Sequence, residues 1–493
     1  MTQSELFAQS STPWRPHNYQ KKAVKFLLEH ACAALFLDPG LGKTSVTFAA
    51  IKFLKAKGLV DKVLIVAPLR VCHAVWPDEG KKWTDFEGLR VVVLHGKDKD
   101  ELLKEDADIY VINAEGLPWL LDITATKGLS GRYRVELDLK RWKRLGFDTL
   151  VIDELSKFKH PQTQRFKALK HVLHTFGRRW GLTGSPASNG LMDLFGQCYV
   201  LDQGRSLGQY ITHYRMKYFT PNFDGFSWDL KEGAEEEIYK RLKPLALRMS
   251  AEDYLELPQL VEHDIRVDLP DKARRVYDQL EDDLIAKIDK KVIVAVNAAA
   301  ASVKCRQVAN GGVYLDPEVE AFLPPHRGPK RKWVDLHDEK VDALADLVDE
   351  LQGDPLLVAY DFEHDLARIK ARLGKRVPHI GGGVTPTESN EIVGRWNRGE
   401  IPVLLAHPQS VAHGLNLQAG GKHVCWHSLT WNYELYDQFI RRIYRQGTKA
   451  KRVIVHRIIA KDTVDEAVIA ALRSKERGQK ALFEALRSRR RRR

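Results

Sequence analysis

Residues 35–44, LFLDPGLGKT, combine residue types that can bind the phosphates of a nucleotide. An apolar run leads into a glycine-rich turn, and a Lys-Thr pair then opens a segment with helical periodicity. Glycines let backbone N–H groups approach phosphate oxygens, and a helix N-terminus adds positive potential. Lys43 can reach the outer phosphates, and the hydroxyl of Thr44 can hold Mg²⁺. The sequence therefore predicts an ATP-binding loop made of Asp38, Pro39, Gly40, Leu41, Gly42, Lys43 and Thr44.

Asp153 and Glu154 close the apolar segment 149–154, TLVIDE, which is typical of a buried parallel strand. Two adjacent carboxylates beside a phosphate loop can divide the work of hydrolysis. One organises Mg²⁺, and the other positions and deprotonates the attacking water. An Asp-Glu pair at a strand end also serves as a helix cap, and the pair alone does not decide between the two interpretations. Its place after a phosphate loop favours catalysis.

Two groups of short apolar segments predict two sheets. Continuous runs rich in β-branched residues are typical of parallel strands that are covered on both faces. Helical or loop segments lie between them, as in a doubly wound α/β fold. The stretch between the groups, about residues 270–310, is Ala-rich and predicts helix. The segments of the first group are 63–68, 90–96, 109–113 and 149–154, and those of the second are 355–360, 377–380, 402–407, 423–427 and 453–459.

The composition narrows the class of protein. A chain of 493 residues is long enough for about two to four domains. No apolar run approaches the roughly 18 residues of a membrane helix, and the first residues lack a signal-peptide pattern. The five cysteines are spread without a C-x-x-C pair, which argues against disulfides or a zinc site. We therefore expect a cytoplasmic protein with no membrane partner and no metal besides the Mg²⁺ of a nucleotide.

The net charge of +13 indicates a polyanionic partner. Six arginines lie in the last seven residues, 487–493, and subtracting these six from +13 leaves +7 for the rest of the chain. Such an end is either a solvated tail or a segment that grips nucleic acid, and composition alone leaves both possibilities open.

Eight elements, in order, resemble those of the Snf (Swi/Snf-like) branch of the superfamily 2 helicase-related ATPases. They run from about residue 14 to 460, and their order is far more specific than any one motif. The phosphate loop is one of them, in the Asp-x-Gly-x-Gly-Lys-Thr form that helicase-type ATPases use. The elements are RPHNYQ (15–20), DPGLGKT (38–44), IVAPLRV (65–71), VIDELSKFK (151–159), LTGSPASN (182–189), PLLVAYDFEHD (355–365), AHGLNLQ (412–418) and QFIRRIYRQG (438–447).

The resemblance implies an α/β fold of two RecA-like, doubly wound parallel-sheet lobes with a helical insertion between them. ATP would bind in the cleft between the lobes and drive movement along double-stranded DNA, which is held by backbone contacts. The expected parts are lobe 1 at 1–250, the helical spacer at 251–335, lobe 2 at 336–480 and the basic tail at 481–493. The compact length is similar to that of prokaryotic or bacteriophage members, which implies a bacterial or phage-infected host cytoplasm.

The resemblance also assigns roles in the first lobe. Tyr19 and Gln20 match the segment that recognises adenine, although a pair at a helix N-terminus is the structural alternative. Lys43, Asp153 and Glu154 match catalytic groups. Asp153 matches the acid that holds Mg²⁺ together with Thr44, and Glu154 matches the catalytic base. Thr183 and Ser185 match the segment that relays the nucleotide state to the nucleic-acid contacts.

In the second lobe, Gly414 and Asn416 match a loop that meets both nucleotide and nucleic acid. Arg442 and Arg445 match arginines that reach the γ-phosphate. A planar guanidinium that is always charged can neutralise charge that builds on the phosphoryl oxygens. The alternative is that these arginines form a solvated helical face.

Three functions stay open at this point. The first is an ATP-hydrolysing motor that moves on duplex DNA. The second is a helicase that separates strands of DNA or RNA. The third is a DNA-binding scaffold that is gated by ATP without turnover, although intact Lys43, Asp153, Glu154 and Arg445 argue against it.

The arginine tail gives a first testable prediction. Removing Arg489–Arg493 should weaken DNA binding and flatten its dependence on salt concentration, because each phosphate contact releases counterions. Fluorescence anisotropy with a labelled duplex at several salt concentrations measures both quantities. Unchanged binding at low salt would identify the segment as a solvated tail.

Overall fold

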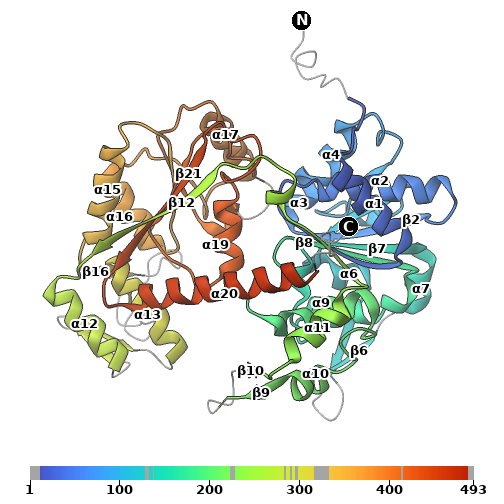
Figure 1. Ribbon diagram of the computed structural model, residues 1–493, viewed down its shortest axis with the longest axis horizontal. Coiled ribbons are helices and arrows are strands. Elements are labelled where there is room, and N and C mark those ends of the chain that lie inside the picture. Colours follow the sequence, from blue (N-terminus) through green and yellow to red (C-terminus); the bar gives the residue numbers. More distant parts are fainter. Residues whose placement is uncertain are drawn as a thin grey trace, which may run out of the picture. The chain divides into compact units, whose positions relative to one another are not determined.

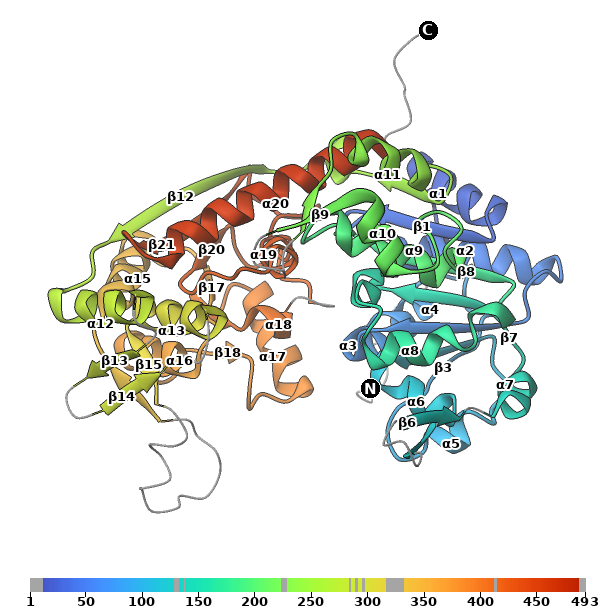
Figure 2. The same ribbon diagram turned by 90° about the horizontal axis from the view of Figure 1, so that it is seen from below.

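The computed structural model describes residues 12–127, 133–136, 138–222, 228–282, 285–288, 291–294, 298–315, 332–411 and 415–486. Contacts divide these residues into two compact units. The first unit holds the described parts of Met1–Leu255 and Arg477–Arg493, and the second holds those of Glu256–Glu476. Each unit is built around its own sheet (Figures 1 and 2).

A seven-stranded sheet lies at the centre of the first unit, in the order β11-β1-β8-β7-β2-β4-β3. Every pair of neighbouring strands is parallel. Helices lie on both faces (Figure 1), which explains why the strand residues are almost all buried. The strands are β1 (Cys32–Leu37), β2 (Lys62–Ala67), β3 (Val91–Val93), β4 (Ile109–Asn113), β7 (Phe147–Asp153), β8 (Arg178–Thr183) and β11 (Ala246–Met249).

Short helices and two hairpins connect these strands. The hairpins are β5 (Thr124–Lys127) with β6 (Tyr133–Glu136), and β9 (Phe219–Pro221) with β10 (Trp228–Leu230). The α-helices are α1 (Asn18–Glu29), α2 (Lys43–Ala56), α3 (Leu69–Ala74), α4 (Trp76–Lys82), α5 (Lys99–Leu102), α6 (Leu117–Leu120), α7 (Leu139–Leu145), α8 (Gln164–Lys170), α9 (Leu194–Asp202), α10 (Ile211–Tyr218) and α11 (Ala234–Leu242).

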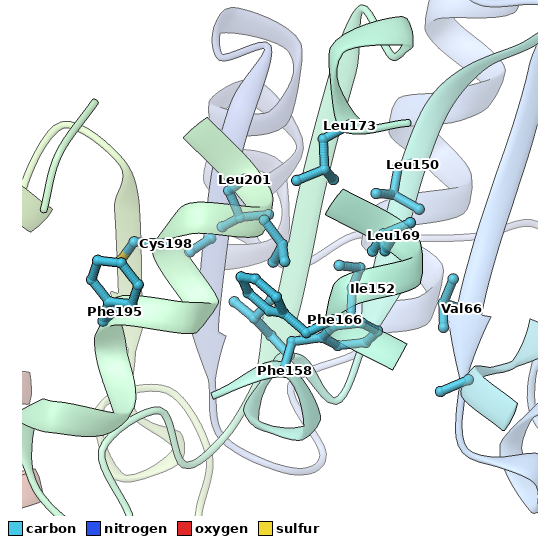
Figure 3. Packing of buried hydrophobic residues seen from close by; sticks show 14 of the residues in the cluster. Val66, Leu150, Ile152, Phe158, Phe166, Leu169, Leu173, Phe195, Cys198 and Leu201 are labelled. Atoms are coloured by element: carbon cyan, nitrogen blue, oxygen red, sulfur yellow. The ribbon is translucent and has the colours of Figure 1, made fainter. Parts of the chain in front are cut away.

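A hydrophobic cluster fixes the carboxyl end of β7 against the helices that follow it. Figure 3 shows Leu150 and Ile152 of β7 beside Phe166 and Leu169 of α8, with Phe158 between these elements and α9. All five side chains are at most 3% exposed. Close packing of this kind leaves a strand end little freedom to move. The packing therefore fixes the point in the sheet from which the next two residues, Asp153 and Glu154, extend.

The second unit contains a six-stranded sheet in the order β12-β21-β20-β17-β19-β18, again parallel throughout. Its strands are β12 (Gln259–Val267), β17 (Leu356–Ala359), β18 (His379–Ile380), β19 (Val403–Ala406), β20 (His423–Trp426) and β21 (Arg452–Ala460). Around it lie α12 (Asp271–Asp282), α13 (Ala298–Asn310), α15 (Glu339–Glu350), α16 (Glu363–Leu373), α17 (Pro386–Asn397), α18 (Pro408–Val411), α19 (Tyr433–Ile440) and the start of α20 (Val464–Leu486).

Alternate residues of the central strand β17 pack into different helical layers. Leu356 and Val358 belong to a cluster with residues of α15 and α16, whereas Leu357 and Ala359 belong to a cluster with residues of α17 and α19. This alternation follows from the two-residue period of a strand. Two parallel sheets, each between layers of helices, confirm the predicted fold class.

The prediction of helix over about residues 270–310 is only partly right. Helices α12 and α13 flank a hairpin of β13 (Ile285–Ile288) and β14 (Lys291–Val294). The sequence KIDKKVIV places β-branched residues on both sides of a short polar turn, which favours strands over helix. A second hairpin, β15 (Gly312–Tyr314) with β16 (Trp333–Asp335), follows α13.

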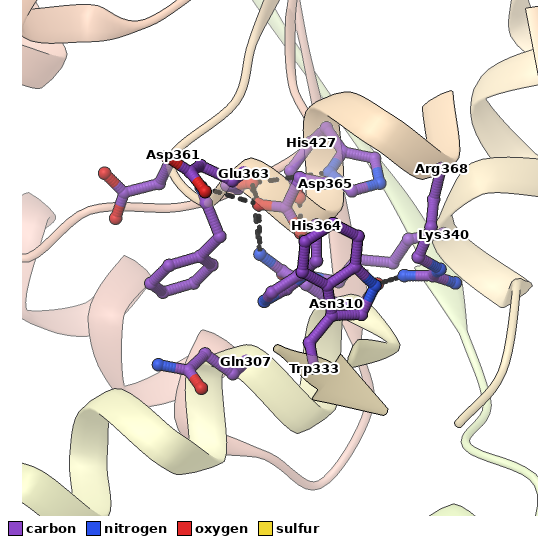
Figure 4. Close-up of polar contacts among 12 residues, drawn as sticks. Gln307, Asn310, Trp333, Lys340, Asp361, Glu363, His364, Asp365, Arg368 and His427 are labelled. Carbon is purple, nitrogen blue, oxygen red and sulfur yellow. Dashed lines mark hydrogen bonds and ion pairs between the residues drawn. The ribbon is translucent and has the colours of Figure 1, made fainter. Parts of the chain in front are cut away.

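A buried polar network joins α13, α15 and α16 to the residues after β20 (Figure 4). The Asn310 amide donates to Asp365 Oδ2 at 3.1 Å and to Ser428 Oγ at 3.0 Å. Lys340 Nζ donates to Asn310 Oδ1 at 2.9 Å and lies 2.5 Å from Asp465 Oδ2. Because the ammonium group of Lys340 is completely buried, buried protein groups such as the Asp465 carboxylate must compensate its charge. The network fixes how the three helices meet the sheet.

His337, just before α15, gives a prediction about pH. Its Nε2 lies 2.8 Å from Val308 O and its Nδ1 lies 3.4 Å from Glu339 N, so the two contacts together require a neutral ring. Burial lowers the pKa of His337 to about 4. In the unfolded chain a histidine binds a proton below about 6.5, so stability should fall as pH drops from 6.5 toward 4, by about 1.4 kcal/mol per pH unit.

Urea unfolding at pH 7 and pH 5 measures this effect. His337→Asn should flatten the pH dependence relative to the wild type, and His171→Asn, which changes an exposed histidine, should leave it unchanged. Equal pH slopes for the wild type and His337→Asn would contradict the prediction.

Candidate functional site

The carboxyl ends of β1, β8 and β7 meet at one edge of the first sheet, because β8 pairs with both of its neighbours. In the register, Phe36 of β1 lies opposite Thr183, and Asp153 lies opposite Leu182. The phosphate loop follows β1, Asp153 and Glu154 end β7, and Thr183 ends β8. Three motifs that are far apart in the sequence therefore come together.

The phosphate loop depends on two glycines. Gly40 and Gly42 have φ angles of +92° and +76°, which are strained for any residue with a Cβ atom. Helix α2 begins at Lys43, directly after Gly42, so Thr44 lies in its first turn. The Lys43 ammonium donates to Leu37 O at 2.9 Å. Burial lowers the pKa of Lys43, while Glu154 and two further acids oppose this shift.

Pro39 and Leu41 hold the loop in place. Leu41 is completely buried. Pro39 lies against the segment after β8, since a Cβ added to Gly184 would come within 3.2 Å of Pro39 Cδ. The loop and the TGSPASN segment are therefore in direct contact.

Asp38 serves to brace the loop. Arg248 of β11 lies 2.7 Å from Asp38 Oδ1, and both side chains are 4% exposed. The other oxygen, Oδ2, accepts hydrogen bonds from Ala251 N at 3.0 Å and from Ser250 Oγ at 3.4 Å. The sequence analysis placed Asp38 among the nucleotide-binding residues, and the structure adds that its carboxylate binds the chain that follows β11. Arg248 was not anticipated, because it lies 210 residues away in the sequence.

Gln20 lies beside the same loop. Its amide donates to Leu41 O at 3.4 Å, and a Cβ added to Gly42 would lie 2.5 Å from Gln20 Nε2. Tyr19 is 5% exposed, and its ring packs against the rings of His17 at 5.3 Å and Tyr254 at 4.9 Å. The structure thus brings Gln20 to the phosphate loop, while base recognition by Tyr19 and Gln20 stays a prediction.

Glu154 has a left-handed backbone, with φ at +64°. Its Oε1 accepts hydrogen bonds from Thr183 Oγ1 at 3.0 Å and from Ser156 Oγ at 3.1 Å. Thr183 Oγ1 in turn accepts from Ser185 N at 3.1 Å. A non-glycine residue in this conformation costs energy and is typical of functional sites. Of the two predicted coupling residues, Thr183 therefore bonds directly to the predicted catalytic base, and Ser185 is connected to it through Thr183.

The Asp153 carboxylate is surrounded by protein groups that change its pKa. Burial and the neighbouring Glu154 raise the pKa of Asp153 to about 6, whereas Lys43 opposes the shift. The indole N–H of Trp76 donates to Asp153 Oδ2 at 3.0 Å. No motif in the sequence pointed to Trp76.

In the second unit, the structure brings together Arg445 and Asn416. Arg445 donates to Asn416 Oδ1 at 2.8 Å, and burial lowers the pKa of Arg445. Arg442 is 9% exposed and donates to Leu415 O at 3.1 Å. Both arginines follow α19, which ends at Ile440, so they do not form a solvated helical face. Gly414, the other residue predicted for this loop, lies outside the described residues.

Among the described residues, no helix is long and apolar enough to cross a membrane.

Comparison with known proteins identifies the family. A family model described as the SNF2-related domain matches residues 19–315, which is more than half of the chain. The chain belongs to the SNF2 family. A second model, the helicase conserved C-terminal domain, matches residues 339–447. The resemblance seen in the sequence is therefore confirmed, and the chain is a helicase-related SNF2 protein.

Relatives occur in a phage and in bacteria. The chain is 33% identical over 488 residues to protein p41 of Acyrthosiphon pisum secondary endosymbiont phage 1, covering 96% of this chain and 98% of p41. It is 25% identical to a Mycoplasma genitalium protein described as an uncharacterized ATP-dependent helicase. That match covers 93% of this chain and 41% of the relative, so this chain spans less than half of its length.

The Sulfolobus solfataricus SWI2/SNF2 ATPase core, solved in complex with dsDNA, is 22% identical to this chain. The match covers 98% of this chain and 96% of the archaeal one, with a TM-score of 0.43.

The pair of Arg248 and Asp38 leads to a prediction about stability. Arg248→Met leaves the Asp38 carboxylate buried without its cation and should lower the free energy of unfolding by about 3–5 kcal/mol. Arg90→Met is a matched control, because Arg90 lies at the same distance of 2.7 Å from Glu105 but the two side chains are 60% and 39% exposed. It should cost less than about 1 kcal/mol in urea unfolding. Equal losses for the two variants would contradict the assignment of Asp38 as a buried brace.

Proposed function

We propose that this SNF2 protein hydrolyses ATP when it is bound to double-stranded DNA and uses the energy to move along the duplex. The observation that supports the proposal most is the meeting of the phosphate loop, the Asp153–Glu154 pair and Thr183 at one sheet edge. Family membership supports the same proposal independently of the geometry.

ATP and Mg²⁺ fit the donors at this edge. The Thr44 hydroxyl and the Asp153 carboxylate supply hard oxygen ligands of the kind that Mg²⁺ prefers, so these two residues would hold it. Bound there, Mg²⁺ would neutralise charge on the phosphates. Lys43 and the N-terminus of α2 would bind the same phosphates, since both are positive and belong to the phosphate loop.

Glu154 would act as the base that positions and deprotonates the attacking water. Its carboxylate is oriented by the hydroxyls of Thr183 and Ser156, so a change at Thr183 alters the position of the base. We propose that Thr183 and Ser185 relay the nucleotide state in this way.

The remaining predicted contacts are part of the same proposal. Tyr19 and Gln20 would recognise adenine beside the phosphate loop. Asn416 would contact the nucleotide, and Arg442 and Arg445 would stabilise charge on the γ-phosphoryl group during hydrolysis. Gln20 Nε2 is already bonded to the loop, and Asn416 is bonded to Arg445.

Duplex DNA is the proposed track, held mainly through its phosphates, and binding should therefore depend strongly on salt. The net charge of +13 supports a polyanionic partner. The phage origin of p41 supports a place of action in the cytoplasm of a bacterium or a phage-infected host.

The central prediction concerns ATP turnover. Hydrolysis should rise strongly when duplex DNA is added, and Lys43→Ala or Glu154→Gln should abolish it, because the phosphate grip or the base is lost. Phosphate release is measured with duplex DNA, single-stranded DNA, RNA and no nucleic acid. Lys52→Ala changes an exposed lysine on the same helix, α2, and should retain turnover. Equal turnover with and without every nucleic acid would contradict the proposal.

Two further assays separate the alternatives. Displacement of a triplex-forming strand without unwinding of the duplex indicates translocation, whereas unwinding indicates a helicase. ATP-dependent DNA binding without turnover indicates a scaffold.

Thr183→Val tests the connection to the base. The substitution keeps the side-chain shape but removes the donor to Glu154, so kcat should fall by about 10- to 100-fold while nucleotide affinity stays unchanged. Thr149→Val is the matched control, because Thr149 is also buried and lies on β7, where its hydroxyl donates to Asp148 at 2.7 Å. Wild-type kcat for Thr183→Val would rule out the positioning role.

A further inference from the structure

Trp76 links the two elements that carry the predicted Mg²⁺ donors. It is the first residue of α4, and its side chain is completely buried. The indole N–H donates to Asp153 Oδ2 at 3.0 Å, over a separation of 77 residues. Trp76, a residue of α4, therefore fixes the position of one oxygen of the Asp153 carboxylate at the end of β7.

The indole ring also contacts α2, the helix that begins with Lys43 and Thr44. Its centroid lies 5.5 Å from that of Phe48, which stacks in turn on Phe86 at 5.4 Å. Phe48 is completely buried, so this contact leaves the ring little freedom. A single rigid side chain thus touches the helix of Thr44 and holds the carboxylate of Asp153.

Other buried indoles of the first unit make a different kind of contact. Trp142 donates to Thr175 Oγ1 at 2.9 Å, and Trp180 donates to His30 O at 3.1 Å. These acceptors are neutral groups outside the nucleotide site. The acceptor of Trp76 is an ionisable carboxylate within it.

We propose that Trp76 is a positioning residue for Mg²⁺–nucleotide binding. Its N–H holds Asp153 Oδ2 so that the other oxygen, Oδ1, stays oriented toward the metal, and its ring keeps Asp153 in register with α2. This inference rests on the proposed function, because it assumes that Asp153 helps to hold Mg²⁺. Hydrogen bonds that orient a metal-binding group commonly change metal affinity by about 10- to 100-fold when they are removed.

Binding of a fluorescent ADP analogue to the full chain tests the proposal without DNA or hydrolysis. The analogue is titrated in Mg²⁺ and in EDTA, and the Mg²⁺ concentration needed for tight binding is measured. Trp76→Phe should raise this concentration by at least about 10-fold, while the affinity in EDTA stays within about twofold of the wild type. Trp142→Phe removes a buried indole of the same unit and should change neither value.

A double variant shows whether Trp76 acts through Asp153. Once Asp153→Asn has weakened Mg²⁺ binding, adding Trp76→Phe should have no further effect on the Mg²⁺ requirement. Melting temperatures are recorded for each variant, and Trp76→Leu, which also lacks a donor, takes the place of Trp76→Phe should the latter fail to fold.

Three results would overturn the inference. The first is an unchanged Mg²⁺ requirement in Trp76→Phe, and the second is an equal loss of affinity in EDTA, which would mean that the ring only supports the phosphate loop. The third is a wild-type affinity that does not respond to Mg²⁺ at all. A rate of ATP hydrolysis that does not change when DNA is added would contradict the proposed function instead. The higher Mg²⁺ requirement expected for Trp76→Phe would still be observed in that case.

Discussion

Strand β8 is hydrogen-bonded to β1 on one side and to β7 on the other, and all three strands run in the same direction. Their carboxyl ends must therefore lie at a common edge, and this geometry brings Lys43, Thr183 and the Asp153–Glu154 pair within reach of one ligand. Strand pairing alone is enough to bring these residues to one edge, without contacts between the loops. An antiparallel β8 would place Thr183 at the opposite edge, and Glu154 would lose the hydroxyl that orients it.

Two basic residues, Arg248 and Lys43, compensate the acidic residues at this edge. Arg248 compensates Asp38 and fixes it to β11, which leaves Lys43 close to Asp153 and Glu154. Burial and Glu154 raise the pKa of Asp153, whereas Lys43 opposes this shift. Phosphates would give Lys43 a stronger partner, and a divalent cation would stabilise the two carboxylates.

The sequence alone predicted the local patterns well. The phosphate loop, the acidic pair and most buried strands are contiguous runs of residues, and the residue types in each run predict its local conformation. The two-sheet fold follows from the order of these runs. Contacts between residues that are far apart in the sequence could not be predicted. Nothing near Trp76 or Arg248 indicates an acidic partner, because their positions are set by strand order and helix packing.

Strand β12 and the β13–β14 hairpin are among the strands that the sequence analysis did not predict. Most residues of β12 are exposed or half-buried, so this edge strand lacks the apolar run that marks the central ones. The β13–β14 hairpin lies among helix-forming residues, and its strands are only four residues long. β12 therefore gives a weak strand signal, whereas the β-branched residues of the hairpin were outweighed by the helical pattern of the long segment around them.

The brace between Asp38 and the chain after β11 also has a mechanical meaning. Ala251 donates to Asp38, and Leu255 Cδ1 lies 4.0 Å from the place where a Cβ of Gly40 would stand. The backbone then continues without interruption into Glu256, where the second unit begins. The connection to the second unit therefore starts from residues that are hydrogen-bonded to the phosphate loop through Asp38.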